Sequence, residues 1–272
     1  MDNCKNNRRQ PYEGNVFKYY SAQRDSFFDD FFVRFSQKRV LNDNRECRPR
    51  FYFDNTYNIN HTLAIQYVNE HYPHCTDAVK NKLIPQIEKS INWPMRILKA
   101  YVRTLNKLGI FSLAKTQYNL HLWNNYAKDG FCVEFDFNSP FFHPRENDSI
   151  GLGELYPVIY SDNPIIFDAQ KFVEHGHNDY LSIDVFYQKT PKWREEDEVR
   201  IIRFRCFADK QEDSDRVSLF MVPKDSIVAV YFSQYATSYF IDECVKKIYI
   251  NLPETPVYHV TDIINQKLSR II

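Results

Sequence analysis

Charged side chains gather in the segment KWREEDEVRII, residues 192–202, directly before a pair of isoleucines. If this segment is a strand, the alternation of side chains places Glu196, Glu198 and Arg200 on one face and the apolar residues on the other. Such a face is typical either of a solvated edge strand or of a catalytic carboxylate with supporting charges. Because two neighbouring carboxylates repel each other, we expect a cation nearby, with Arg200 holding one carboxylate and Glu198 turned towards a ligand.

Hydrolase chemistry finds less support. The segment HGHND gives His175, His177 and Asp179 the spacing of some two-metal hydrolases, but such enzymes need further histidines downstream and only His259 follows. A polar turn is the favoured interpretation, so a metal-dependent hydrolase is only the third functional hypothesis and no metal is predicted. A serine nucleophile is disfavoured too, because no G-x-S-x-G motif occurs.

The segment LHLWNNYAKDGFCVEFDF predicts a helix that leads into a half-buried strand. On a helix, Trp123 and Tyr126 are three positions apart and share a face, so we expect both rings to be buried against the sheet. Gly130 allows the chain to turn between the two elements. The helix would then buttress a pocket into which Ser112 points from the end of the preceding strand.

The order of elements predicts an α+β fold with a mixed, mostly antiparallel sheet, because strands and helices follow each other without regular β-α-β alternation. After a flexible N-terminus at residues 1–14, we expect a single domain over 15–272 with a helical insertion at about 58–108. Pro73, Pro85 and Pro94 would divide that insertion into helices, and Gly109 would cap the last one. Sheet strands are expected near 16–20, 131–137, 155–160 and 198–206, a helix at 164–187, and a final strand near 245–251.

Composition limits the partners. The 272 residues include 35 basic and 35 acidic side chains, which cancel, so no overall field favours nucleic acid or an anionic membrane. The six cysteines form no C-x-x-C pair, which argues against a zinc ribbon. The chain begins without the apolar run of a signal peptide, and no later run approaches the length of a membrane span, so we expect a cytoplasmic protein.

Five short motifs follow each other along the chain: VFKYYS, which contains Lys18 and Tyr19; VRFSQ followed by LNDNRE; IFSL, with Ser112, followed by WNNYAKDGFCVEFD; VIYS; and KWREEDEVRII. In order and spacing they resemble the bacterial domain-of-unknown-function family 2971. The resemblance covers the chain from about Val16 to Ile248.

One loop departs from the family pattern. Where the family usually has Pro-Phe after Asn-Asp, this chain has Asn44 and Arg45. The conformation of the loop and a role for Glu46 therefore do not follow from the resemblance.

The layout is also similar to that of ADP-ribosyltransferases, which use NAD as a substrate. Cleavage of the nicotinamide–ribose bond builds positive charge on the ribose, and a carboxylate held nearby stabilises that charge. The similarity implies catalytic roles for Glu198, beside the ribose, and for Glu196, at the acceptor. The implied NAD-binding residues are Lys18, Tyr19, Ser112 and Arg200.

A non-enzymatic interaction module, or one associated with phage defence, is an equally open alternative. An enzyme requires Lys18, Ser112 and Glu198 to converge on one cleft, whereas an interaction module requires an exposed apolar patch without such convergence. The acceptor is not specified by the sequence. Because neutralising a charge-strained carboxylate costs the fold little, we expect Glu198→Gln to leave stability nearly unchanged.

Overall fold

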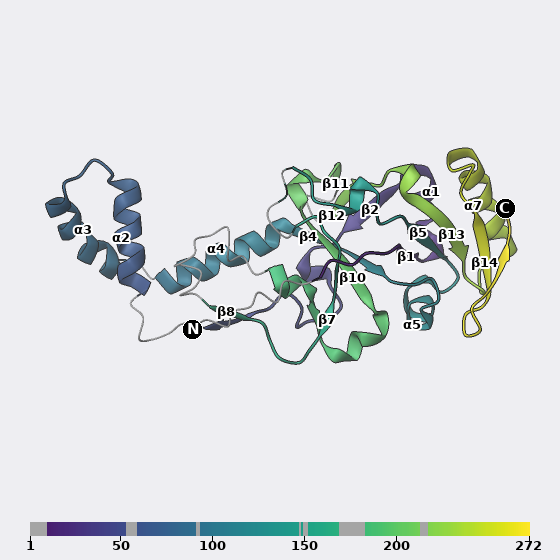
Figure 1. The fold of residues 1–272 in the computed structure, drawn as a ribbon, viewed down its shortest axis with the longest axis horizontal. Helices are drawn as coiled ribbons and strands as arrows, with labels where there is room; N and C mark the ends of the chain where they lie inside the picture. Colours follow the sequence, from purple (N-terminus) through teal and green to yellow (C-terminus); the bar gives the residue numbers. More distant parts are fainter. Residues whose placement is uncertain are drawn as a thin grey trace. The chain divides into compact units, whose positions relative to one another are not determined.

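The chain divides into two compact units in a computed structural model that describes residues 10–52, 59–90, 93–146, 148, 152–168, 183–212 and 217–272. The first unit comprises Met1–Glu46, Leu108–Asp162 and Phe186–Ile272, and the second comprises Cys47–Lys107 and Asn163–Val185. Figure 1 shows the elements of both units. Of the N-terminal segment predicted to be flexible, residues 1–9 lie outside the described part of the chain.

A large sheet forms the centre of the first unit. Its strand order is β15-β14-β13-β5-β1-β4-β10-β6, and its neighbours are antiparallel except for the parallel pair β13 and β14. The predicted mixed, mostly antiparallel α+β architecture is thus confirmed. The strands are β1 (Val16–Tyr20), β4 (Leu108–Ala114), β5 (Phe131–Phe135), β6 (Tyr156–Pro157), β10 (Glu198–Phe204), β13 (Ile227–Phe232), β14 (Val257–Asp262) and β15 (Lys267–Arg270).

The alternation of side chains along the strands separates two apolar clusters on the two faces of this sheet. On β5, Phe131, Val133 and Phe135 join the larger cluster, whereas Cys132 joins the smaller one. The larger cluster also contains residues of α1 (Phe27–Asp30) and α7 (Ser238–Asn251). α7 begins at a Thr237 cap, whose side chain accepts a hydrogen bond from the backbone of Phe240 at 3.2 Å.

Smaller sheets complete the first unit. β2 (Phe32–Phe35), β11 (Lys210–Glu212) and β12 (Val217–Met221) form a three-stranded antiparallel sheet in the order β11-β12-β2. β7 (Ile159–Tyr160) pairs in parallel with β9 (Gln188–Lys189). The strand expected near 155–160 is therefore split between this pair and β6 of the large sheet.

The second unit contains the predicted helices. They are α2 (Ile59–His71), α3 (Asp77–Ser90) and α4 (Trp93–Lys107), accompanied by the parallel pair β3 (Arg50–Tyr52) and β8 (Ile166–Asp168). Pro73 separates α2 from α3, whereas Pro85 lies inside α3. The helix expected at 164–187 is wrong where β8 forms, and residues 169–182, which include the HGHND segment, lie outside the described residues.

Two further predictions at element ends are wrong. The expected final strand near 245–251 is the last part of α7, which runs to Asn251. Gly109 does not cap a helix but lies inside β4. A Cβ atom there would lie 2.8 Å from the Cβ of Phe35, so glycine is needed because β2 approaches β4 closely, where Ser36 bridges to Ile110.

The predicted aromatic pair takes two different environments. Trp123 is 0% exposed, donates from Nε1 to the carbonyl of Gln117 at 2.7 Å and meets the ring of Tyr19 edge-on at 5.0 Å. Its predicted burial is confirmed. Tyr126, however, is 39% exposed, so the prediction of burial is wrong for this ring.

The reason is a π-helical turn at Trp123–Ala127, in which Lys128 N donates to the carbonyl of Trp123 five residues earlier at 2.6 Å. Such a turn holds more residues than an α-helical turn. A side chain three positions after Trp123 therefore no longer shares its face.

Replacing Trp123 with Ala should lower the free energy of unfolding by about 3–5 kcal/mol, because it removes a fully packed ring and leaves a cavity. Denaturant unfolding measures this change. Leu120→Ala is the matched control, since Leu120 precedes the same turn and is 44% exposed. A loss below about 1 kcal/mol for the tryptophan variant would show that the ring carries no core packing.

Candidate functional site

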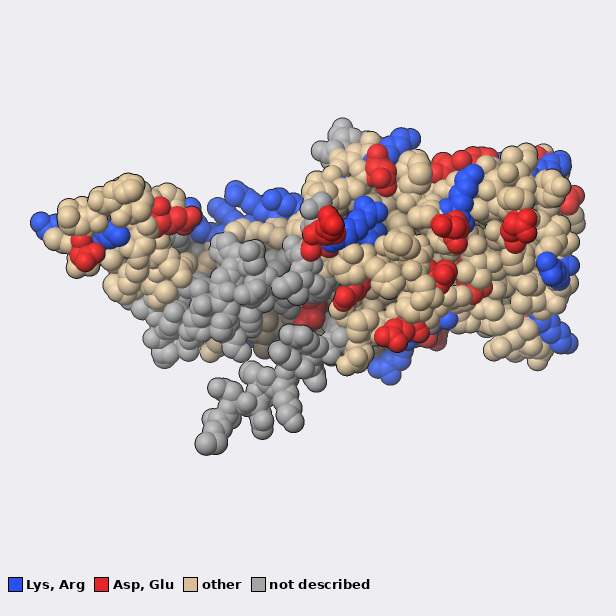
Figure 2. Space-filling model, turned by 45° about the horizontal axis from the view of Figure 1, so that its top comes forward, with Lys and Arg blue, Asp and Glu red and all other residues tan. Residues whose placement is uncertain are grey.

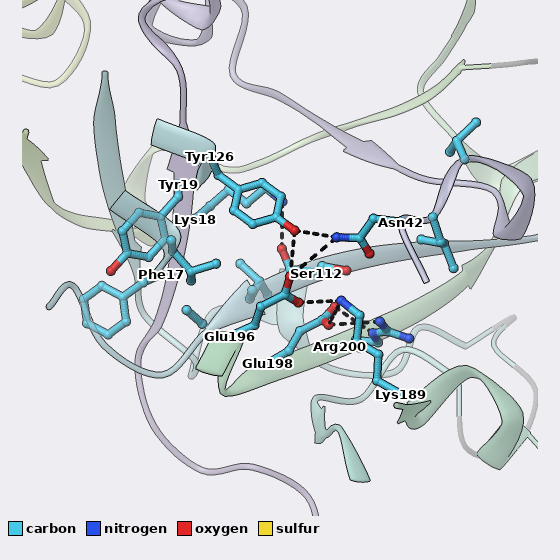
Figure 3. Close-up of a pocket in the computed structure, with 15 residues that line it drawn as sticks. Phe17, Lys18, Tyr19, Asn42, Ser112, Tyr126, Lys189, Glu196, Glu198 and Arg200 are labelled. Atoms are coloured by element: carbon cyan, nitrogen blue, oxygen red, sulfur yellow. Dashed lines mark hydrogen bonds and ion pairs between the residues drawn. The ribbon is translucent and has the colours of Figure 1, made fainter. Parts of the chain in front are cut away.

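A cavity of ≈ 220 Å³ opens in the first unit between β1, β4, β10 and the turn that carries Tyr126. Its walls include the apolar residues Phe17, Val40, Leu41, Leu113, Ala114 and Leu122. Figure 3 shows the polar side chains that point into it. The six residues that the sequence singled out all line this cavity: Lys18, Tyr19, Ser112, Glu196, Glu198 and Arg200.

Glu198 is buried and held by two cations. β10 pairs with β4 so that Arg200 lies opposite Ser112. Arg200 donates from Nε to Oε1 of Glu198 at 2.7 Å and from Nη2 to Oε2 at 2.9 Å. Lys189 donates to the same Oε2 at 3.1 Å. Figure 3 shows the convergence of these groups.

These contacts determine the charge of Glu198. Burial raises the pKa of this carboxyl group, but Arg200, Lys189 and hydrogen bonds from Arg200 and Ser112 outweigh burial and lower it to about 2. Glu198 is therefore ionised throughout the physiological pH range.

Glu196 is not on the strand, so the prediction of one face for both glutamates is wrong. It ends a short 3₁₀ helix, Pro191–Glu196, and Asp197 then takes a left-handed conformation with φ 43°. This turn brings the Glu196 carboxylate back to the cavity, where Oε1 accepts from the Tyr126 hydroxyl at 2.6 Å. Oε2 accepts a short hydrogen bond from Lys189.

Lys189 is the cation that sequence reasoning missed. Its buried ammonium group contacts Glu196 and Glu198, lies 3.8 Å from Oε1 of Glu46, and sits 5.1 Å from the centre of the Trp193 ring. Burial lowers the pKa of Lys189, but Glu198 and Glu46 raise it, and the net shift is upward. No periodic pattern relates residue 189 to the strand, because the 3₁₀ helix lies between them.

The loop at residues 42–46 fastens several parts of the site. Asn42 donates to the Tyr126 hydroxyl at 2.5 Å. The carboxylate of Asp43 accepts hydrogen bonds from the backbone and hydroxyl groups of Thr190, at 2.8 and 2.7 Å. Because Thr190 follows Lys189, this contact fixes the position of the bridging cation.

Glu46 completes the charge cluster in spite of the Asn44-Arg45 departure. Its Oε1 accepts a short hydrogen bond from Nη2 of Arg200, whereas Oε2 has no hydrogen-bond partner among the described residues. Burial raises the pKa of Glu46, and Arg200 and Lys189 reverse only part of that shift. Arg45 instead pairs with Asp162 at the surface, at 3.2 Å.

Asn119 links the helical turn to the segment that carries the glutamates. Its side-chain oxygen caps the short helix α5 (Leu120–Leu122) by accepting from Leu122 N at 3.0 Å. Its side-chain amide donates to the carbonyls of Glu195 at 2.7 Å and Glu196 at 3.2 Å. The positions of Tyr126 and Glu196 are thus coupled through one residue.

Lys18 and Tyr19 contribute in different ways. The ammonium of Lys18 donates to the carbonyl of Ser112 at 2.8 Å and lies 5.3 Å from the centre of the Phe111 ring, and no carboxylate of the described residues pairs with it directly. Burial lowers the pKa of Lys18 to about 8, against the opposing effect of the site's glutamates. The hydroxyl of Tyr19 is already bonded to the backbone of Thr116 and Asn119, so only its ring faces the cavity.

The described residues contain no group of three or more histidine, cysteine, aspartate or glutamate side chains arranged to hold a metal ion. Within the same residues, no helix has the length and apolar character needed to cross a membrane. On the face shown in Figure 2, acidic and basic side chains are interspersed over the first unit.

Comparison with known proteins supports the resemblance predicted from the motifs. A family model described as "Protein of unknown function (DUF2971)" matches residues 122–201. This part of the chain resembles the DUF2971 family. The region that matches DUF2971 contains Tyr126, Lys189, Glu196, Glu198 and Arg200, whereas Lys18 and Ser112 lie before it. The chain has no match among curated proteins or among solved structures.

The structure reverses the expectation that Glu198→Gln would leave stability unchanged. Glu198 is compensated rather than strained, and removing one partner from a buried ion pair costs about 3–5 kcal/mol. We expect a loss of this order in the free energy of unfolding at neutral pH, measured with a denaturant. Glu195→Gln is the control, because the Glu195 side chain is 78% exposed. Equal stability of the two variants would contradict a stabilising role for the cluster.

The stability difference between the unmodified protein and the Glu198→Gln variant should depend on pH. Because the folded-state pKa of Glu198 is lowered from 4.5 to about 2, its contribution to stability is present above pH 4.5 and is lost as the pH falls towards 2. The stability difference between the unmodified protein and Glu198→Gln should therefore shrink over that range. A difference that stays constant from pH 6 to pH 3 would contradict this assignment.

Proposed function

We propose that the cavity is the catalytic site of an enzyme that binds the nicotinamide end of NAD and cleaves the bond between nicotinamide and ribose. The observation that carries the proposal is the meeting of two buried glutamates, Glu196 and Glu198, with Lys18 and Ser112 at one largely apolar cavity. A small apolar pocket with a few convergent charged groups is the usual form of a ligand site. Perturbed ionisation of such groups is typical of catalytic sites.

Glu198 supplies the charge that this reaction needs. Cleavage is heterolytic: the bonding electron pair leaves with the nicotinamide nitrogen, and positive charge develops on C1′ and the ring oxygen of the ribose. A carboxylate with a pKa of about 2 is ionised whenever substrate is bound. Among the described residues, the three carboxylates of Glu46, Glu196 and Glu198 pair directly with two cations, so the cluster favours a cationic transition state.

In this proposal Glu196 handles the acceptor. Its Oε1 is bonded to Tyr126, a partly exposed side chain, and lies 3.5 Å from the amide of Asn42. We infer that the acceptor enters on this side of the cluster. With water as the simplest acceptor, the water oxygen bonds to C1′ and its proton passes to Glu196.

A non-enzymatic interaction role has one observation in its favour. α7 exposes the large apolar side chains Tyr239, Tyr249 and Ile250. Exposed apolar surface of this kind is a feature of protein contact sites. It does not account for the buried charges of the cavity, so the enzymatic proposal is preferred.

Incubation with NAD and chromatographic measurement of free nicotinamide test the proposal. The unmodified protein should release nicotinamide, and Glu196→Gln should lower the rate by about 10²–10⁴-fold, the usual contribution of a positioned acid or base. Glu195→Gln should keep full activity, because that carboxylate lies at the surface.

A second variant tests the proposal even if Glu196→Gln fails to fold. Tyr126→Phe keeps the ring at a partly exposed position and removes the hydroxyl group, which donates to Glu196 and accepts from Asn42. Its rate should fall by about 10- to 100-fold, the value of one hydrogen bond to a charged group. Absence of nicotinamide release by the unmodified protein, with NAD in excess, would overturn the proposal.

A further inference from the structure

The cations that line the cavity differ in how they are paired. The carboxylates of Glu196 and Glu198 bind Lys189 and Arg200 directly, with Glu46 as an additional carboxylate behind them. Lys18, in contrast, has a single hydrogen bond, to the Ser112 carbonyl, and no direct ion pair within the described part of the chain. Two of its three N–H groups are thus free to donate to a ligand.

A partly buried cation with free donors favours a ligand with an anionic oxygen. Glu198, Glu196 and the thiol of Cys132 favour the charged form of Lys18, and Lys189 disfavours it. Both glutamates are already paired with other cations, so their repulsion of an anion beside Lys18 is reduced. The glutamate cluster, with its excess of carboxylate, favours a cationic centre in the same ligand.

The size of the cavity limits how much ligand it encloses. Its volume of ≈ 220 Å³ is below the roughly 300–1,000 Å³ of pockets that enclose drug-sized ligands. NAD has two ring systems, two riboses and two phosphates, so the cavity can enclose only one half of it.

We infer that the cavity recognises the zwitterionic nicotinamide mononucleotide unit, with Lys18 as the anchor of its single phosphate, and leaves the adenosine half of a dinucleotide outside. This inference rests on the proposed function. The nicotinamide ring is the cationic centre and contacts the apolar walls, while the ribose lies between Lys18 and the carboxylates. The chain should then hydrolyse the free mononucleotide, with water as acceptor, to nicotinamide and ribose 5-phosphate.

Nicotinamide release from three substrates tests the inference. The values of kcat/KM for NAD and for nicotinamide mononucleotide should agree within about tenfold, because the adenosine half makes few contacts. Nicotinamide riboside, which lacks the phosphate, should be about 10- to 100-fold poorer, the value of hydrogen bonds to a charged group.

Variants assign this preference to Lys18. Lys18→Met should lower kcat/KM for the mononucleotide to that for the riboside and leave kcat/KM for the riboside nearly unchanged. Lys246→Met, at an exposed position on α7, should change neither value. Independently of any variant, ribose 5-phosphate should inhibit the unmodified protein competitively and ribose should not. KM for the mononucleotide should also rise above pH 8, as Lys18 loses its proton, while KM for the riboside should not.

The possible outcomes distinguish failure of the inference from failure of the proposed function. Release from NAD at a rate about 100-fold or more above that from the mononucleotide would overturn the inference and leave the proposed function intact. The same holds if Lys18→Met lowers kcat/KM for all three substrates equally, or if ribose inhibits as strongly as ribose 5-phosphate does. Release from none of the three would overturn both.

Discussion

The ion network between Lys189, Arg200 and three glutamates is the interaction on which the rest of the site depends. The single residue Lys189 contacts both Glu196 and Glu198 and lies near Glu46. Removing ions from water costs several kcal/mol for each ion, and their attraction offsets this cost only when the geometry is good and the remaining hydrogen-bonding groups are satisfied. The network therefore requires its surroundings to be fixed, and the surrounding chain supplies this through the Asp43–Thr190 and Asn119 contacts.

This requirement explains why segments far apart in the sequence are held together. The segment 189–200 contributes four members of the network and the loop at 42–46 contributes Glu46. The turn at Trp123–Ala127 contributes Tyr126, which bonds to Glu196. Tyr126 is held by Asn42 and Glu196 together. A π-helical turn is uncommon and often occurs at functional sites, and here it turns Tyr126 away from the core and towards the carboxylates.

Much of the fold could be predicted because its signals are local. The alternating phenylalanines of β5 and the apolar recurrence over α2 to α4 each report the face that an element buries. Tyr126 could not be placed in the same way, because one additional residue in a helical turn changes the face and leaves no mark on the apolar pattern. The roles of Lys189 and Glu46 could not be predicted for a different reason. Their partners are distant in sequence, and a lone charged residue carries no information about its partner.

Glu196 illustrates the same limit at closer range, because its alternation with Glu198 suggested a strand where the chain makes a turn. The spatial relation of the two glutamates is set by the left-handed backbone at Asp197. Insertion or deletion of one residue between positions 196 and 198 would separate carboxylates that are only two positions apart. The loop reaches the network through Asn42, Asp43 and Glu46, whereas the Arg45 side chain pairs with Asp162 at the surface. A change of side chain is thus tolerated at the loop tip, whereas backbone contacts fix the length of both this loop and the turn at Asp197, although both segments border one cavity.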